Sequence, residues 1–319
     1  MTKLAKIFLI LLLASPVPLF GQKLRYTISP RNAETVLKTE RIRAQVEHLT
    51  DPVLGGRATG TLGAQQVAHW LEGQFRDLAL QPLGGAFLHG FHTGGGLFGR
   101  NVIGILPGSA QPARYVVVMA HYDNLGVLNG TLYPGADSNA SGVAALLQLA
   151  RMFRHMNDCK KTYSTGLIFV ALDAKEKDLA GAEALYKLLE KQGMDILRVV
   201  NLDQLGATLA PLTKGHPNYL MMLSDEADGR RSTLENVNRE QHLGLELSYD
   251  YYGSKDFTQL FYRRISDQRV FLEHGIPAVM FTSGITLNTN KPADDAASLD
   301  YPVLRKRIQL IFYYLDKVL

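Results

Sequence analysis

Apolar residues recur along the chain with two periods, which together predict alternating helices and strands. Apolar positions at helical spacing predict helices over 33–49, 63–80, 140–153, 179–193 and 301–318. Apolar, often β-branched runs predict strands over 100–108, 114–120, 165–173, 198–203, 219–223 and 276–283. Because several runs are apolar without interruption, they are typical of strands buried on both faces. The alternation therefore predicts an α/β fold with a mostly parallel sheet covered by helices on both faces.

The composition supports one globular domain. The chain has 319 residues, of which 46 % are hydrophobic and 20 % charged, and no repeat or long linker divides it. A single Cys excludes a disulfide framework. The formal net charge of +4 is too small and too scattered to predict a nucleic-acid partner.

The first residues have the pattern of an export signal. Lys3 and Lys6 precede the apolar run IFLILLLASPVPLFG, which Pro16 and Pro18 interrupt and which ends at Gly21. The run is too short for a comfortable membrane span, although an uncleaved anchor helix is the alternative. We therefore expect a signal peptide over 1–21, a domain over 22–319, no stable membrane insertion after cleavage, and a periplasmic or extracellular location.

Polar residues follow the predicted strands where a parallel sheet places its ligands. His121 follows one strand, Asp137 opens the next loop, Glu176 follows a third strand and Asp203 ends a fourth. Two carboxylates about 4 Å apart repel by roughly 4 kcal/mol at an effective dielectric constant of about 20, so such a cluster needs a cation. A set of one His and several carboxylates suits zinc. Asp123 is placed to orient the His121 imidazole from behind.

Each of these residues also has a simpler interpretation when taken alone. Asp137 or Ser138 is at a helix start and would serve as an N-cap. Asp203 precedes Gly206 and would serve in a turn. Four such residues at successive strand ends favour a site over four unrelated caps and turns.

Several stretches in the same order resemble metallopeptidase family 28, which contains di-zinc aminopeptidases and glutaminyl cyclases. They are HYD, PGADSNASGVA, FVALDAKEKDLAGAEAL, NLDQLG, SDQRVFLEHGIPAVMFTSG and NTNKPADD. The resemblance runs from about residue 33 to the C-terminus. It implies a single domain whose mixed, mainly parallel, eight-stranded sheet is sandwiched between helices.

The resemblance also implies site roles. His121 and Asp203 fall on ligands of the first zinc ion, Asp137 on the carboxylate that bridges both ions, and Glu176 on a ligand of the second. The family's general-base Glu is replaced by Lys175, and its last His ligand by Asn290. Further departures are Ser138, Gln268 and Thr289, where the family has Asp, His and an aromatic residue.

The departures remove residues that the implied metal-assisted hydrolysis needs, namely its general base and one zinc ligand. Loss of a general base costs roughly 10²–10⁴-fold in rate, and Lys175 as an ammonium cannot take that role. Asn290 is a poor zinc ligand, so we expect at most one zinc ion or none. Two alternatives stay open for the Lys175 ammonium: it lies among Asp137, Glu176 and Asp203 in place of a cation, or it extends into solvent.

Three functions follow from the resemblance. The first is an exported aminopeptidase-like hydrolase with weak activity, and the second is a non-catalytic pseudoenzyme that binds peptides or amino-terminal small molecules. The third, glutaminyl cyclisation, ranks last because the zinc ion of the cyclases uses the missing His.

Two other stretches are weaker signals. Residues 92–100 (HTGGGLFGR) predict a turn between strands. The aromatic run 248–264 predicts either packing beneath a loop or a pocket wall.

Overall fold

The computed structural model describes residues 33–208, 216–225, 229–251 and 253–319. The predicted signal peptide, residues 1–21, lies outside the described residues. The helices are α2 (Thr39–Leu49), α3 (Leu62–Asp77), α4 (Gly142–Asp158), α5 (Ala180–Lys191), α6 (Gly229–Glu240), α7 (Lys255–Arg264), α8 (Gln268–Glu273) and α9 (Tyr301–Val318). Three short helical segments are η1 (Pro52–Arg57), η2 (Ala136–Ser141) and η4 (Ala296–Ser298).

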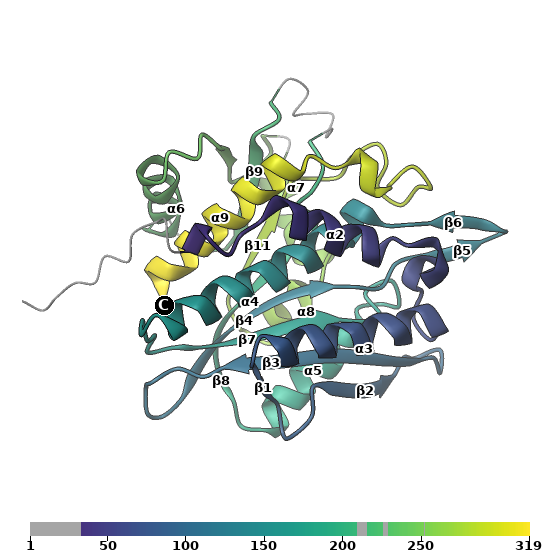
Figure 1. Ribbon diagram of the computed structural model, residues 1–319, viewed down its shortest axis with the longest axis horizontal. Coiled ribbons are helices and arrows are strands. Elements are labelled where there is room, and N and C mark those ends of the chain that lie inside the picture. The colour runs from purple at the N-terminus through teal and green to yellow at the C-terminus, as the bar shows by residue number, and fades with distance from the viewer. Residues whose placement is uncertain (1–32, 209–215, 226–228, 252) are drawn as a thin grey trace, which may run out of the picture.

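One mixed sheet forms the centre of the domain. Its strands are β1 (Gln81–Pro82), β2 (Leu88–His92), β3 (Phe98–Leu106), β4 (Arg114–His121), β7 (Gly166–Leu172), β8 (Asp195–Leu202), β9 (Tyr219–Ser224), β10 (Glu246–Ser248) and β11 (Ala278–Thr282). Their order is β1-β3-β7-β4-β8-β11-β9-β10, and β2 also pairs with β3. A separate hairpin, β5 (Gly126–Leu128) and β6 (Thr131–Tyr133), projects from the body (Figure 1).

The pairing confirms the predicted fold class. The four central strands β7, β4, β8 and β11 are mutually parallel, whereas β3 and β9 join them in the antiparallel sense. β1 and β2 pair with different segments of β3, so these two short strands together fill one position of the predicted eight-stranded sheet. Antiparallel strands at the margins make the sheet mixed.

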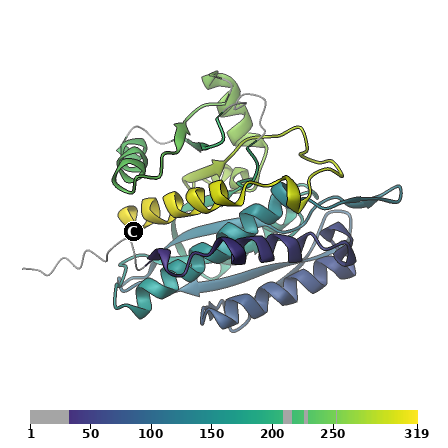
Figure 2. The same cartoon turned by 45° about the horizontal axis from the view of Figure 1, so that its top comes forward.

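Helices cover both faces of the sheet. On β4, Val116 and Val118 pack in the cluster formed with α2, α3, α4 and α9, whereas Val117 and Met119 pack in the cluster formed with α5 and α8. Figures 1 and 2 show α2, α3, α4 and α9 side by side over one face. Because β4 buries both sets of alternating side chains, its sequence is a continuous apolar run.

The predicted elements form, with shifted limits. Residues 33–34 are helical, but a break at 35–38 divides the helix predicted over 33–49, so α2 begins at Thr39. The strand β8 begins at Asp195 rather than at residue 198. The stretch 92–100 makes the predicted turn, since Thr93 N donates to the Leu97 carbonyl between β2 and β3 (2.9 Å). In the run 248–264, Tyr251, Phe261 and Tyr262 are buried in a cluster beside β9 and β11, so these aromatic residues pack in the interior, as one of the two interpretations expected.

In the described part of the chain, we find no helix with the length and apolarity to cross a membrane.

Candidate functional site

Three neighbouring parallel strands bring the predicted residues to one edge of the sheet. His121 is the last residue of β4, the segment Asp173–Glu176 follows β7, and Asp203 follows β8. Because β4 lies between β7 and β8 and all three are parallel, their carboxyl ends meet at this edge. The predicted location of the site is therefore the place where these residues gather.

The His121 imidazole is fully buried between two aspartates. Its Nδ1 lies 3.1 Å from the backbone oxygen of Asp123 and 3.5 Å from Asp123 Oδ1. Its Nε2 lies 3.7 Å from Asp203 Oδ1, which is an ion-pair distance, and has no hydrogen-bond partner among the described residues. Burial and the charge of Lys175 lower the imidazole pKa, but Asp123 and Asp203 outweigh them and raise it to about 10. His121 is therefore charged at neutral pH.

Asp123 also fixes the loop that carries Lys175 and Glu176. Its two carboxylate oxygens accept the backbone N–H groups of Lys175 and Glu176, both at 3.0 Å. Burial raises the pKa of Asp123, but the His121 contact and these N–H groups outweigh burial and lower it. The carboxylate expected to orient His121 thus holds the neighbouring loop as well.

The Lys175 ammonium is enclosed by carboxylates. Its Nζ lies 3.0 Å from Glu176 Oε1, and the two side chains are only 15 % and 19 % exposed. Burial would lower the Lys175 pKa, but the charges of Asp203, Glu176 and Asp267 outweigh burial and raise it. The charge of Lys175 in turn holds the Asp203 pKa well below its usual range against the effect of burial. Of the two alternatives for Lys175, the structure shows the buried one, with Asp267 rather than Asp137 among the carboxylates.

Asp137 faces a different loop. Its Oδ1 accepts the backbone N–H groups of Gly206 (2.7 Å) and Ala207 (3.1 Å), and its Oδ2 accepts Gln204 Nε2 (2.8 Å). Burial and the nearby charge of Asp294 raise the Asp137 pKa to about 7. These contacts tie the turn before α4 to the loop after β8. The three hydrogen bonds occupy both carboxylate oxygens. The role expected for Asp137, to bridge two zinc ions, stays a prediction.

Asn290 lies outside this cluster. Its side chain is exposed, and its backbone has a φ of 59° in the turn before Lys291. The residue before it, Thr289, does contact the loop after β8: its Oγ1 accepts a hydrogen bond from Gln204 Nε2 at 2.9 Å.

The expected ligands do not make a metal centre. Within the described residues, no group of three or more His, Cys, Asp or Glu side chains has an arrangement that could hold a metal ion. The structure brings His121, Asp203 and Glu176 to one edge, with the Lys175 ammonium paired with Glu176 and in electrostatic interaction with Asp203. The residues present therefore do not fit the zinc centre that the resemblance implies.

Two site residues are missing from the sequence predictions. Ser266 Oγ donates to Asp203 Oδ2 at 2.6 Å. In the part of the chain that the structure describes, the fully buried Asp267 has no hydrogen-bond partner at either carboxylate oxygen. Burial raises the Asp267 pKa to about 7, against the opposing charge of His121. Both residues open the stretch SDQRVFLEHGIPAVMFTSG, which carries part of the family resemblance, but the resemblance implied a role for neither of them.

A buried arginine supports the loops of the site. Arg57 donates from Nε to the Tyr122 carbonyl (2.7 Å) and from its Nη atoms to the carbonyls of Leu49 (2.5 Å), Pro134 (2.6 Å) and Gly135 (2.9 Å). Burial lowers its pKa only to about 10, with Asp123 and Asp294 opposing the shift. Arg57 therefore joins the segment after β4 to the turn before α4. Its position in a Gly-rich stretch gave no sign of this role.

Solved structures of an aminopeptidase and of a glutaminyl cyclase share this architecture. The LapA aminopeptidase of Legionella pneumophila superposes with a TM-score of 0.70 at 18 % identity, covering 93 % of this chain and 76 % of that one. The glutaminyl cyclase of Porphyromonas gingivalis superposes with a TM-score of 0.68 at 18 % identity, covering 89 % of this chain and 99 % of that one. At these identities the similarity establishes the fold.

Curated relatives are peptidases of fungi. A "Probable zinc metalloprotease" of Pyrenophora tritici-repentis is 29 % identical over 201 residues, covering 56 % of this chain and 45 % of that protein. "Leucine aminopeptidase 1" of Sclerotinia sclerotiorum is 28 % identical over 172 residues, covering 51 % and 43 %. The chain thus matches less than half the length of these relatives.

The family assignment rests on a longer match. The sequence model of "Peptidase family M28" matches residues 101–315, which is more than half of the chain. The matched region contains every site residue discussed above except Arg57. The chain therefore belongs to peptidase family M28.

Proposed function

We propose that this M28 family member binds the amino-terminal ends of peptides with weak or no hydrolysis. The observation that carries the proposal is the buried Lys175 ammonium, 3.0 Å from Glu176 Oε1, at the position where the family resemblance expects a carboxylate base. We also propose that the chain is exported, on the pattern of its first 21 residues.

The proposal follows from the charge of Lys175. An ammonium cannot accept a proton from water, and loss of a general base costs roughly 10²–10⁴-fold in rate. The same ammonium neutralises Glu176 and Asp203, which would otherwise be available to a cation. We therefore expect this site to form without the family's zinc ions.

The site keeps an excess of negative charge that suits a peptide amino group. The carboxylates of Asp123, Glu176, Asp203 and Asp267 face two cations, Lys175 and His121. Only Lys175, Glu176 and Asp203 among them are reached by solvent. A ligand ammonium at Glu176 and Asp203 would reduce this excess of negative charge. In this interpretation Asp137 has a structural role, since its oxygens hold the loop over 204–207.

The test compares the wild-type protein with variants that restore the family's residues. We expect the wild type to release almost no chromophore from leucine p-nitroanilide, with or without added zinc. The Lys175→Glu/Asn290→His variant, and the same variant with Ser138→Asp, should gain zinc and release chromophore at least tenfold faster. Lys177→Glu is the matched control, because it makes the same charge change two residues away.

Binding is measured on the same samples. Calorimetry should show that the wild type binds a peptide with a free amino terminus more tightly than the N-acetylated peptide. Two equivalents of tightly bound zinc in the wild type, or hydrolysis as fast as in the restored variants, would contradict the proposal.

A further inference from the structure

The hairpin formed by β5 and β6 leaves the body of the domain between two segments of the site (Figure 1). Asp123 precedes the hairpin in the chain and Asp137 follows it. Asn129 and Gly130 form its turn, with φ values of 51° and 78°, as a tight two-residue hairpin turn requires. The hairpin is therefore a regular element that projects close to the site.

The base of the hairpin is fixed to the body. Asn124 Nδ2 donates to the Tyr133 carbonyl at 3.0 Å and closes the base. The segment η1 packs tightly against it, since a Cβ added to Gly56 would lie 2.5 Å from the Tyr133 carbonyl oxygen. A Cβ added to Gly126 would likewise lie 2.6 Å from Ala58 Cβ. These contacts fix the direction in which the hairpin projects.

The outer end of β5 is uncovered on both faces. Val127 is 53 % exposed and Leu128 is 45 % exposed. Because successive side chains of a strand point to opposite faces, neither face is closed by packing at this end. Within the described residues, β5 and β6 pair only with each other, so their outer edges are open as well. A two-stranded hairpin is marginally stable in water and gains stability when further strands are added.

The surface around the hairpin carries almost no charge. In the whole chain 20 % of the residues are charged, yet the stretch 124–136 contains no charged residue. The stretch 52–68, which includes η1, contains only Arg57, and its guanidinium is buried. Both stretches therefore present a neutral surface to the solvent.

The second stretch adds aliphatic surface beside the base of the hairpin. Val53 in η1 is 76 % exposed, and Leu62 at the beginning of α3 is 68 % exposed. A charged residue lies at the border of the stretch, where Asp51 Oδ1 accepts Val53 N at 2.9 Å. An apolar centre with polar groups at its border is the usual composition of a protein–protein interface.

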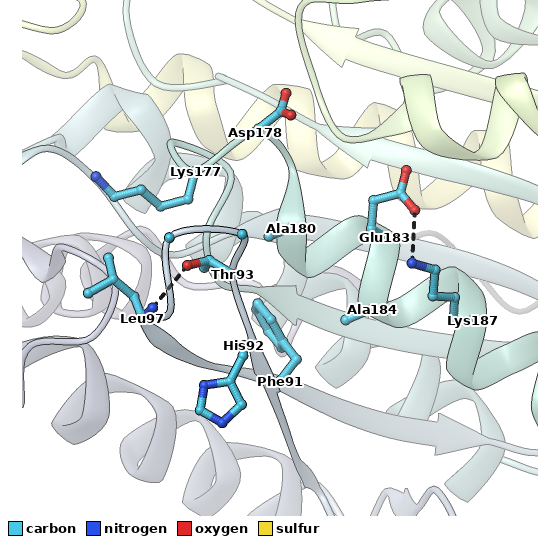
Figure 3. A pocket seen from close by; sticks show the side chains of 12 residues that line it. Phe91, His92, Thr93, Leu97, Lys177, Asp178, Ala180, Glu183, Ala184 and Lys187 are labelled. Atoms are coloured by element: carbon cyan, nitrogen blue, oxygen red, sulfur yellow. Dashed lines mark hydrogen bonds and ion pairs between the residues drawn. The ribbon is translucent and has the colours of Figure 1, made fainter.

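A pocket on the other side of the site loop has a different composition. The pocket between the β2–β3 hairpin and α5 is lined by two cations and two anions, and Figure 3 shows Glu183 paired with Lys187. Water solvates such a surface well, and its balanced charges select no ligand of one sign. Edge strands of natural proteins commonly carry a charged residue or a Pro that prevents pairing with another chain, whereas β5 has neither.

We propose that the hairpin pairs with the hairpin of a second copy of this chain, β5 against β5. A two-fold axis between identical edge strands makes them antiparallel, so the two hairpins form one four-stranded sheet. The neutral surface then meets an identical neutral surface without like-charge repulsion, and Val127 and Leu128 become buried. Each copy supplies the strands that the other hairpin lacks.

A membrane surface fits these observations less well. Anionic lipid headgroups are held by Lys and Arg side chains, and the stretches 52–68 and 124–136 expose none. The partner with the same open edge and the same lack of charge is the second copy.

Sedimentation equilibrium of the purified protein should show a dimer that dissociates on dilution. Leu128→Lys should raise the Kd of the dimer at least tenfold, because it places two ammonium groups close to the two-fold axis. Leu260→Lys is the matched control, since it makes the same change at a leucine of α7 with a similar exposure of 50 %, and it should leave the dimer unchanged. Unchanged melting temperatures show that the variants are folded.

Complementary charges distinguish lost pairing from a damaged hairpin. Leu128→Glu should also weaken the dimer, and an equal mixture of Leu128→Lys and Leu128→Glu should dimerise more tightly than either variant alone. In a Cys159→Ser background, Val127→Cys should cross-link two chains on oxidation, and Leu260→Cys should not.

Two results would overturn the proposal directly. One is a wild type that stays monomeric at about 1 mM, and the other is a dimer that Leu128→Lys leaves unchanged. Binding of the monomer to phosphatidylcholine vesicles or to a peptide through Val127 and Leu128 would assign the hairpin to another partner and would also overturn it. The proposal depends neither on hydrolysis nor on peptide binding, so it is tested separately from the proposed function.

Discussion

Lys175 and Glu176 are adjacent in sequence and form an ion pair, with Nζ and Oε1 3.0 Å apart, at the edge where β7 ends. The pair is possible because Asp123 accepts both backbone N–H groups and so orients the two side chains. Asp203 and Asp267 add negative charge around the ammonium. In this chain a lysine side chain thus provides a positive charge among the carboxylates at this edge of the sheet.

Removal of the Lys175 charge should destabilise the fold. Lys175→Met leaves Glu176 and Asp203 without their cation, and loss of one partner of a buried pair costs roughly 3 kcal/mol. Urea denaturation measures the change in the free energy of unfolding. Lys177→Met is the control, since its exposed ammonium has no partner in the described structure and the substitution should change stability by less than about 0.5 kcal/mol. Equal stability of the two variants would show that the buried ammonium contributes nothing.

Metal removal should leave the stability of the wild type unchanged. A ligand at a thousandfold excess over its Kd stabilises a protein by about 4.1 kcal/mol, so a resident zinc ion would be visible. We expect the same melting temperature in EDTA and in excess zinc, and less than one equivalent of zinc by elemental analysis. Lys175→Glu/Asn290→His should instead melt at a higher temperature when zinc is added. A wild type that loses stability in EDTA would refute this prediction.

Gly181 should not tolerate a side chain. An added Cβ would lie 1.9 Å from the Asp173 carbonyl, so Gly181→Ala must displace the loop after β7 or the beginning of α5. We expect a loss of roughly 1–3 kcal/mol and weaker peptide binding. Gly73→Ala, in α3, meets no atom within 4 Å and should stabilise the protein by about 0.5–1 kcal/mol. A neutral Gly181→Ala would mean that the loop shifts freely.

Arg57 should be needed for folding. Arg57→Met removes the donors from four carbonyls, and each buried unsatisfied group costs about 1–3 kcal/mol, so we expect a loss of roughly 4 kcal/mol or more. Arg57→Lys should recover only a part, because an ammonium cannot reach four carbonyls in the plane of a guanidinium. Arg114→Met removes a surface arginine and should have little effect. Thermal and urea denaturation compare the three variants, and an Arg57→Met protein as stable as wild type would exclude this role.

The central sheet was predictable because its strands leave a strong local pattern. The β4 run from Val116 to Met119 is apolar on both faces, and no other environment suits it as well. The limits of the elements were less predictable. Apolar residues keep the helical spacing over residues 33–38, but α2 begins only at Thr39. The end of β4 at His121 followed from the same pattern, and so did the edge at which the site forms.

The sequence alone determined the alternation of helices and strands and the strand-end positions of His121, Glu176 and Asp203. The replacement of the family's residues by Lys175 and Asn290 is what the resemblance implies. Only the tertiary structure decided which carboxylates surround Lys175, because those contacts join loops that are far apart in the chain. Asp267 and Arg57 are polar residues without a local pattern, and their partners are set by packing between α7, α8, η1 and the strand ends. Local periodicity fixes which face of an element is buried, whereas the direction of a polar side chain at its end depends on which loops meet there.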